Sequence, residues 1–464
     1  MEHTENNRLL IAYFGDDFTG STDALEFLCR AGIKTVLFID VPTAEQLQQY
    51  PGIQAIGIAG MTRALSPQNM ELVIKPTFKA LKQLNPKHVH YKVCSTFDSS
   101  PSIGSIGKAI DVAQVVFETP FVPLVVAAPA LGRYCLFGNL FAKMGIGSDG
   151  DIYRLDRHPS MSKHPVTPAD ESDIRLHLAK QTTKKIGLFI ITSLHQFVKK
   201  PFDIDFADNE IMLFDALTNE DLKPVGEIIE SQSTANNVVF SVGSSGVEMA
   251  LGAYWKESGL VSDEATWNDV ELSTPVLIIS GSCSPVTSAQ IQYALNKGFA
   301  EIGIDTVTLA KQYEADSEIN ENISIAYAEE VSKLIKSGKN VLVHTSLGND
   351  DVRVIETDKI MKSKELDKSV ASKIYGSLLG SIARIVSEQT NLERIIIAGG
   401  DTSSYAARAM EIEAVEMILP LAPGAPLCRA SSKNTAINNL QVVFKGGQVG
   451  KPDFFVQAAK NNFN

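Results

Sequence analysis

Two adjacent carboxylates follow the first apolar run of the chain and could act on a hydroxyl group. Residues 9–14 read LLIAYF, and the segment GDDFTG follows at 15–20. One carboxylate of Asp16 and Asp17 could take a proton from a substrate hydroxyl while the other orients the substrate or binds Mg²⁺. The alternative is an acidic pair at a helix N-terminus, with Thr19 as the cap. Asp23, further along, is expected on a solvated helix face or as a capping residue rather than as a ligand.

Two basic residues are expected near the same carboxylates. Arg63 follows an apolar segment at 55–59, and Lys92 lies in another at 88–94. Because ligands of parallel sheets bind at the carboxyl ends of the strands, both side chains could reach the acidic pair. Arginine offers a bidentate clamp for a carboxylate, and lysine offers a point charge. The alternative is that both are surface charges.

Three loops rich in glycine and small hydroxyl residues are typical of phosphate sites. They read SGSCSP at 280–285, AGGDTS at 398–403 and KGGQVG at 445–450. Backbone N–H groups between a strand and a helix can approach an anion at the start of the helix. Each loop alone could equally be a tight turn. No GxxxxGK[ST] segment occurs, so none of them is a Walker A loop.

Strands alternating with helices must position these residues, and the pattern predicts the α/β class. Short buried apolar runs separated by amphipathic stretches are typical of βαβ units. We expect two α/β domains, at 1–258 and 270–464, each with a mostly parallel sheet flanked by helices and with the active site in the cleft between them. The polar, acidic segment 256–274 suggests the boundary.

Two further expectations concern single segments of the chain. Thr306–Leu309 is expected to be a strand. Residues 133–170 are rich in Gly, Pro, His and Ser, and are expected to be irregular and functional. His158 and His164 lie there, and we interpret them as polar loop residues rather than metal ligands.

Composition excludes several classes of function. Lys and Arg number 42 and Asp and Glu 54 among 464 residues, a formal net charge of −12. Sequence-independent nucleic-acid binding needs cationic neutralisation of phosphates, so nucleic acid is not an expected partner. No apolar run is long enough to span a membrane, and the polar start MEHTENN does not resemble a signal peptide. Five scattered cysteines show no disulfide framework, so we expect a cytoplasmic protein.

Together these segments resemble the four-carbon acid sugar kinase family, formerly a family of unknown function. The resemblance spans nearly the whole chain, in the family's order. Its segments are DDFTGSTD at 16–23, MTRAL at 61–65, VGSSGV at 242–247, SGSCSPVTSAQI at 280–291, AGGDTSSYAA at 398–407, LAPGAPL at 421–427 and FKGGQVG at 444–450.

The resemblance implies an N-terminal domain that binds a sugar acid and a C-terminal domain that binds ATP. The reaction it implies is ATP-dependent phosphorylation, with Mg²⁺, of a terminal hydroxyl of threonate, erythronate, 3-oxo-tetronate or a related acid. Asp17 would be the base and Asp16 would position substrate or metal. The acid would be bound by Arg63, Lys92, Ser95 and Thr96. ATP would be held by Ser280, Ser282, Gly399, Gly400, Asp401, Thr402, Gly446 and Gly447. A homodimer is compatible with this plan.

One segment departs from the family pattern. Members usually continue the Lys92 strand as Asp-Ser-Thr-Leu-Arg-Gly, whereas residues 94–99 read CSTFDS here. The loss of an arginine clamp, replaced by Asp98, should change which acid is accepted. We therefore include a branched 3-oxo acid such as 3-oxo-isoapionate among the substrates. The alternatives to a kinase are an ATP-using ligase or an aldolase on the same plan, and an inactive metabolite-binding protein.

Overall fold

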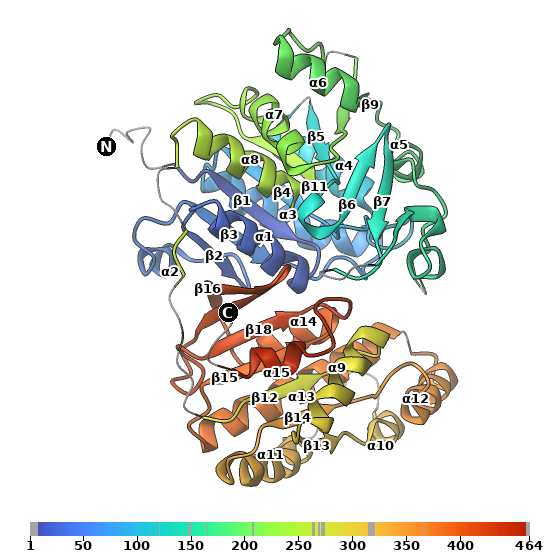
Figure 1. Cartoon of the computed structure of the whole chain (residues 1–464), viewed down its shortest axis with the longest axis vertical. Helices are drawn as coiled ribbons and strands as arrows, with labels where there is room; N and C mark the ends of the chain where they lie inside the picture. Colours follow the sequence, from blue (N-terminus) through green and yellow to red (C-terminus); the bar gives the residue numbers. More distant parts are fainter. Residues whose placement is uncertain are drawn as a thin grey trace. The chain divides into compact units, whose positions relative to one another are not determined.

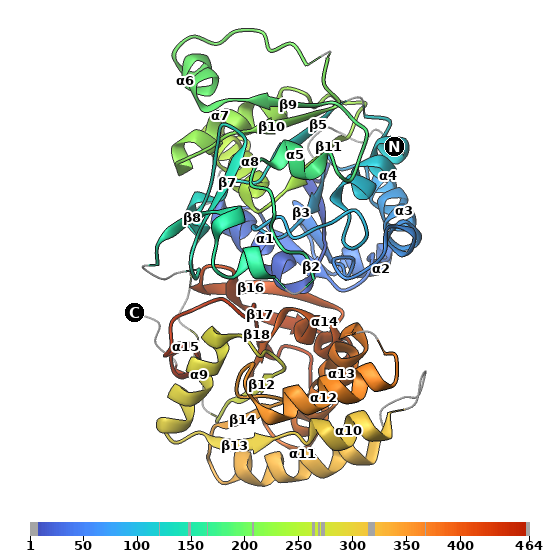
Figure 2. The same cartoon turned by 90° about the vertical axis from the view of Figure 1, so that its right-hand side faces the viewer.

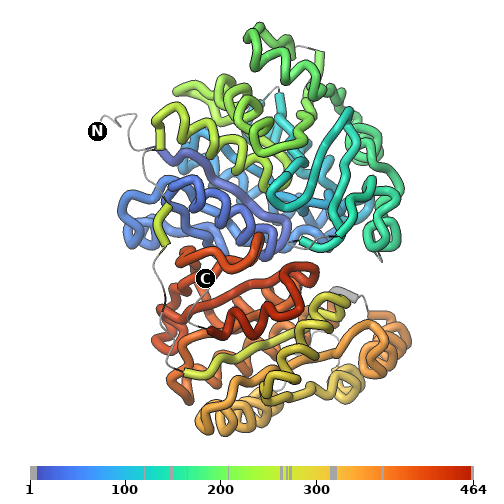
Figure 3. Tube along the Cα trace, viewed as in Figure 1, coloured from blue at the N-terminus to red at the C-terminus, as the bar shows by residue number. Residues whose placement is uncertain are grey.

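The chain forms two compact units, residues 1–266 and 267–464. The computed structural model describes residues 8–460, except 120, 147–149, 165, 207, 262–264, 268–269, 271–273, 314–320 and 367. Figure 3 traces the chain through both units. The domain limits expected above, and the expected location of the reaction between the domains, stay predictions. Part of the acidic segment 256–274 lies outside the described residues.

A parallel sheet forms the centre of the first unit. Its strands lie in the order β2-β3-β1-β4-β11-β5-β10-β9, and all neighbours run parallel. They are β1 (Ile11–Gly15), β2 (Thr35–Phe38), β3 (Ala55–Ala59), β4 (His88–Lys92), β5 (Val122–Val125), β9 (Ile186–Phe189), β10 (Ile211–Phe214) and β11 (Val239–Gly243). Strands of such sheets are buried on both faces, which explains their continuous apolar runs.

Helices cover this sheet in two groups. Helix α8 packs against α1 and α7, whereas α3 packs against α4 (Figure 1; Figure 2). The helices of the unit are α1 (Phe18–Arg30), α2 (Ala44–Gln48), α3 (Pro67–Gln83), α4 (Ile106–Phe117), α5 (Ile174–Leu178), α6 (Ile191–Lys199), α7 (Asn219–Glu230) and α8 (Gly246–Glu257). The predicted α/β class is thus confirmed.

An aromatic cluster fixes the middle of this unit. Phe14 stacks on Tyr91 with ring centroids 6.0 Å apart, and Phe117 stacks on Phe240 at 5.5 Å. Phe78 of α3 contacts all four rings. Each buried aromatic side chain contributes on the order of 2–3 kcal/mol by leaving water. The cluster therefore holds β1 and β4, the strands that carry the candidate residues, in fixed register.

A small antiparallel sheet occupies part of the segment that the sequence predicted to be irregular. It consists of β6 (Arg133–Leu136), β7 (Asn139–Lys143) and β8 (Ile152–Arg154). The β6–β7 turn is Phe137-Gly138, and both residues have positive φ, 50° and 81°. This is the backbone of a two-residue hairpin turn, but a phenylalanine in the first position is no turn signal. Both N–H groups donate to the carboxylate of Asp215, at 2.7 and 3.0 Å.

The second unit repeats the α/β plan. Its strands lie in the order β13-β14-β12-β15-β18-β17-β16, parallel from β13 to β18 and antiparallel beyond. They are β12 (Leu277–Ser280), β13 (Ala300–Gly303), β14 (Val341–His344), β15 (Arg394–Ala398), β16 (Ala414–Ala422), β17 (Ala425–Ser431) and β18 (Gln441–Lys445). Helix α13 packs against α11 and α14, whereas α9 packs against α15. The helices are α9 (Pro285–Asn296), α10 (Thr306–Gln312), α11 (Glu321–Lys336), α12 (Val352–Ser363), α13 (Lys368–Gln389), α14 (Gly400–Ala409) and α15 (Phe454–Ala458).

One predicted strand in this unit is wrong. Thr306–Leu309 begins the helix α10, and the side chain of Asp305 caps it by accepting from the N–H of Thr308 at 3.0 Å. The buried residues of α10 are Thr306, Leu309 and Ala310, which is the spacing of one helix face. By its composition, this short apolar stretch could form a strand or a helix. The cap supplied by Asp305 favours the helix.

Candidate functional site

The predicted acidic and basic residues meet at the switch point of the first sheet. From β1 the chain proceeds to β2 and β3 on one side, and then to β4 on the other side of β1. Ligands of open α/β sheets bind at such a point, beyond the carboxyl ends of the strands. Asp16 and Asp17 follow β1, Arg63 follows β3, and Lys92 ends β4.

Arg63 bridges the two carboxylates. Its Nε and Nη2 donate to Asp16 at 3.1 and 2.7 Å, and its Nη1 donates to Asp17 at 2.7 Å. Burial raises the pKa of Asp16, and the positive charge of Arg63 opposes that rise. Both carboxylates are buried, so the guanidinium offsets a repulsion that would otherwise be costly. In this arrangement Arg63 belongs to the acidic pair rather than to an open surface.

Asp17 also starts the helix α1. Its Oδ1 accepts from the N–H of Gly20 at 2.7 Å, and its Oδ2 accepts from the Thr19 hydroxyl at 3.0 Å. The helix cap is thus Asp17, and the expectation that Thr19 is the cap is wrong. Three fixed donors hold the Asp17 carboxylate in one orientation.

Lys92 is paired inside the unit. Its Nζ lies 3.4 Å from Asp23 Oδ2, and Asp23 also accepts from the hydroxyl of Ser245. Burial alone would lower the pKa of Lys92, but the nearby carboxylates of Asp23 and Glu248 outweigh it and raise the pKa. Asp23 is buried, so the expectation that it lies on a solvated helix face is wrong. Its position on α1 faces the sheet, where Lys92 supplies the counter-charge.

Gly20 lies close to all of these groups, and a side chain there would be crowded. A Cβ added at Gly20 would lie 2.6 Å from Asp17 Oδ1, 3.4 Å from Lys92 Nζ and 3.7 Å from Arg63 Nη2. One point therefore faces a carboxylate, an ammonium and a guanidinium. A hydroxylated acid could bind there through its hydroxyl groups, because the same point offers both donors and acceptors.

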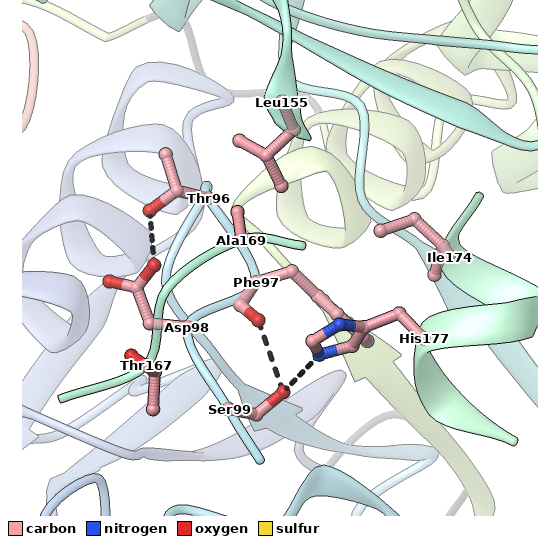
Figure 4. A pocket seen from close by; sticks show the side chains of 9 residues that line it. All are labelled: Thr96, Phe97, Asp98, Ser99, Leu155, Thr167, Ala169, Ile174 and His177. Atoms are coloured by element: carbon pink, nitrogen blue, oxygen red, sulfur yellow. Dashed lines mark hydrogen bonds between the residues drawn. The ribbon is translucent and has the colours of Figure 1, made fainter. Parts of the chain in front are cut away.

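The loop after β4 carries Ser95 and Thr96. Ser95 Oγ accepts from Arg133 Nε at 3.1 Å, and Thr96 Oγ1 donates to Asp98 Oδ1 at 2.9 Å. Figure 4 shows Thr96, Asp98 and Ser99 beside a cavity of about 10 Å³. That volume suits about one water molecule and not a sugar acid. The loop therefore borders the candidate site, and this cavity is not the substrate pocket.

The glycine loops of the second unit converge at its own switch point, between β12 and β15. A Cβ on Gly281 would lie 2.2 Å from Thr402 Oγ1, and one on Gly447 would lie 3.0 Å from Ser282 Oγ. The Ser284 side chain caps α9 and donates to the carbonyl oxygen of Gly447. The three loops thus approach one another closely, and a side chain at Gly281 or Gly447 would crowd the neighbouring loop.

The remaining predicted nucleotide residues differ in position. Gly399 has φ of 123°, which favours glycine, and it precedes Gly400, the first residue of α14. Gly446 lies directly after β18. Ser280 is buried, and its hydroxyl has no hydrogen-bond partner within the described residues. Asp401 is exposed and accepts from Ser372 Oγ of α13 at 3.1 Å, so its carboxylate turns toward α13.

Lys445 is a buried cation that the sequence did not single out as a site residue. Its Nζ donates to Thr287 Oγ1 at 3.0 Å and to the carbonyl oxygen of Gly446 at 2.8 Å, and lies 5.9 Å from the ring centre of Phe455. It forms no ion pair with the carboxylates that the structure describes. Burial therefore lowers its pKa to about 7.

Metal-ligand clusters and membrane-spanning helices are both absent from the described residues. No group of three or more His, Cys, Asp or Glu side chains there could hold a metal ion. His158 Nδ1 accepts from the N–H of Ser160 at 3.2 Å, and His164 Nδ1 accepts from the N–H of Thr167 at 3.1 Å, so both rings stabilise turns. No helix of this part of the chain is long and apolar enough to cross a membrane.

Comparison with known proteins identifies the family. Residues 11–251 match a family model described as a sugar-binding N-terminal domain, and residues 277–455 match one described as a nucleotide-binding C-terminal domain. A 3-oxo-isoapionate kinase of Paraburkholderia graminis is 38% identical over 449 residues, covering 96% of this chain and 93% of that protein. The chain belongs to the four-carbon acid sugar kinase family.

A second kinase is similar to this chain over nearly its whole length. A 3-oxo-tetronate kinase of Pseudomonas savastanoi is 25% identical over 461 residues, covering 98% of both chains. The chain is therefore an ATP-dependent phosphotransferase that acts on a sugar acid. A crystal structure titled putative tRNA synthase from Salmonella typhimurium shares the fold, with a TM-score of 0.73 and 23% identity over 97% of this chain and 98% of that one. A Haemophilus influenzae protein does so with a TM-score of 0.64 and 21% identity over 96% and 98%.

Proposed function

We propose that this kinase phosphorylates a terminal hydroxyl of a small 3-oxo sugar acid, with a branched acid of the 3-oxo-isoapionate type as the preferred substrate. The observation that carries the proposal is the 38% identity to a 3-oxo-isoapionate kinase, against 25% to the 3-oxo-tetronate kinase of Pseudomonas savastanoi. The replacement of the usual family arginine by Asp98 supports it, because a changed clamp changes the accepted acid. Threonate, erythronate and 3-oxo-tetronate are the competing substrates.

The acid is proposed to bind beside Gly20, near Asp17, Lys92 and Arg63. Asp17 accepts the proton of the attacking hydroxyl, and its three fixed donors hold it in position to do so. Phosphoryl transfer depends mainly on alignment and charge stabilisation, so a carboxylate that is paired with Arg63 can still serve. Asp16 orients the substrate, and Lys92 supplies positive charge.

ATP is proposed to bind at the converging loops of the second unit. Backbone N–H groups at the starts of α9 and α14 suit phosphate oxygens, and the glycines allow the close approach. Ser282, Thr402 and the Gly446–Gly447 turn border that place. Lys445 lies next to the turn, where it donates to the Gly446 carbonyl oxygen, and phosphate bound there would favour its charged form.

Mg²⁺ is proposed to bind together with the nucleotide. It usually takes most of its ligands from phosphates and water, with one or two carboxylates from the protein. This fits a chain whose described residues offer Asp16 and Asp17 rather than a cluster of three. The ion would neutralise charge on the phosphates during transfer. A cytoplasmic location and a homodimer stay predictions.

The test is an ADP-release assay with Mg-ATP and a panel of acids. The panel contains 3-oxo-isoapionate, 3-oxo-tetronate, threonate and erythronate, and product is quantified in parallel. We expect ADP and phosphorylated acid in equal amounts, with the highest kcat/KM for the branched acid. Faster turnover of a four-carbon acid would refute the preference, and no turnover with any acid would refute the proposal.

A further inference from the structure

Arg133 is a buried arginine without a directly bonded carboxylate in the described part of the chain. It begins β6, is 6% exposed, and forms no ion pair with any described carboxylate. The other two cations of the site are both paired, Arg63 with Asp16 and Lys92 with Asp23. A buried charge without a counter-ion is costly, so it points to an anion that binds from outside.

One side of the Arg133 guanidinium is held by the protein and the other is not. Its Nε donates to Ser95 Oγ at 3.1 Å, and its Nη1 donates to the carbonyl oxygens of Leu131 at 2.9 Å and Lys143 at 3.1 Å. Nη2 makes no hydrogen bond with the described residues. Its N–H groups therefore still have donor capacity for a ligand.

The guanidinium borders the candidate substrate site. Ser95, which holds it, stands three residues after Lys92 on the loop that follows β4. Burial lowers the pKa of Arg133, and the nearby Cys94, Asp23 and Asp98 side chains oppose that change. Asp23 is the residue that pairs with Lys92, so Arg133 and Lys92 share one electrostatic environment.

The other basic groups at this edge are already occupied. Arg63 uses three N–H bonds on the two carboxylates of the acidic pair. Position 98, where the family pattern has an arginine, is an aspartate whose carboxylate accepts from Thr96. Arg133 is therefore the guanidinium of this edge whose charge is still available, among the residues that the structure describes.

We propose that Arg133 binds the carboxylate group of the sugar acid and sets the requirement for an acid. This deepens the proposed function and rests on it. Nη2 donates to the carboxylate, and Ser95 holds the guanidinium in place through Nε. Ser95 is thus a positioning residue for Arg133, and its effect on the acid is indirect. Arg63, in contrast, serves the acidic pair.

The experiment compares the acid with its neutral carboxamide in wild type and in Arg133→Met. We expect the wild type to prefer the acid, and Arg133→Met to lose roughly 10- to 100-fold in kcat/KM for the acid, mostly through KM. The carboxamide should change little, and KM for ATP should not change. Ser95→Ala should show a smaller loss in the same direction. Arg157→Met, whose side chain is 76% exposed, is the matched control and should behave like the wild type.

Several outcomes would overturn the inference. Equal losses for acid and carboxamide would show that Arg133 only stabilises the fold, and an unchanged kcat/KM for the acid would remove it from the site. If circular dichroism shows that Arg133→Met does not fold, kcat/KM for the acid and for the carboxamide is compared in Arg133→Lys and Ser95→Ala instead. If the wild type turns over no acid, the proposed function fails, and calorimetric binding of acid and carboxamide to wild type and variant still decides the role of Arg133.

Discussion

Replacing Lys445 by methionine should make the stability of the protein less dependent on pH. Lys445 is buried, and burial lowers its pKa from 10.5 to about 7. Between these values the unfolded chain binds a proton that the folded chain does not bind. The ammonium therefore destabilises the folded state fully below pH 7, and this effect disappears as the pH rises toward 10.5. The variant has no such group to titrate.

The magnitude follows from the two pKa values. The difference between 10.5 and about 7 corresponds to about 5 kcal/mol of destabilisation at low pH. About 2 kcal/mol of this should be recovered between pH 7 and pH 9. Lost hydrogen bonds to Thr287 and Gly446 also change the stability of the variant, but that contribution does not vary with pH. The difference in free energy of unfolding between the wild type and Lys445→Met therefore varies with pH only through the titration of Lys445.

The assay is urea unfolding at pH 7 and pH 9, followed by circular dichroism, for the wild type and Lys445→Met. We expect the free energy of unfolding of the wild type, relative to the variant, to rise by about 2 kcal/mol between the two pH values. Lys339→Met, an exposed lysine of the same unit, is the control and should show no such change. A difference between wild type and Lys445→Met that is constant with pH would refute the reasoning.

Three further substitutions test the two sites separately. Asp17→Asn keeps a good helix cap, so the fold should persist while kcat falls by roughly 10²- to 10⁴-fold and ATP affinity stays the same; an unchanged kcat would remove Asp17 from the role of base. Gly20→Leu should fill the point facing Lys92 and Arg63 and raise KM for the acid at least tenfold without changing KM for ATP. Gly447→Val should raise KM for ATP without changing KM for the acid, because its side chain would meet Ser282. Steady-state kinetics with each substrate varied in turn measures both, and parallel losses for both substrates would contradict the assignment of separate sites.

The sequence predicted that the acidic and basic residues lie at one edge of the first sheet, because parallel strands impose a simple geometry, whereas their roles stay predictions. Asp16, Asp17, Arg63 and Lys92 each stand at the end of an apolar run, and the carboxyl ends of such strands share one edge. The same rule brought the glycine loops at 281 and 399 to one switch point. What the sequence could not show is the pairing within the site. The residues that hold Arg63 are 46 and 47 positions away in the chain.

Each wrong or missed expectation has a physical cause. Asp23 was expected in solvent because an acidic residue on a helix usually is exposed, but a buried lysine pairs with it. Thr306–Leu309 fits a strand by composition, but Asp305 caps a helix there. Arg133 shows no signal in its own segment, because its partner Ser95 is 38 residues away. Lys445 stands out only when the structure shows that none of the described carboxylates forms an ion pair with it.

The Asp215 carboxylate, which accepts from both residues of the Phe137-Gly138 turn, also accepts from the N–H of Ile191 at 3.1 Å. It thereby fastens the β6–β7 hairpin to the end of β10 and to the start of α6. The hairpin is an attachment to the parallel sheet rather than one of its strands, and Arg133 stands at its base. A change in the length or shape of this attachment would therefore leave the hydrogen bonds that align β1, β3 and β4 intact. The residue proposed to recognise the acid and the strands that carry Asp16, Arg63 and Lys92 are thus structurally separable parts of one unit.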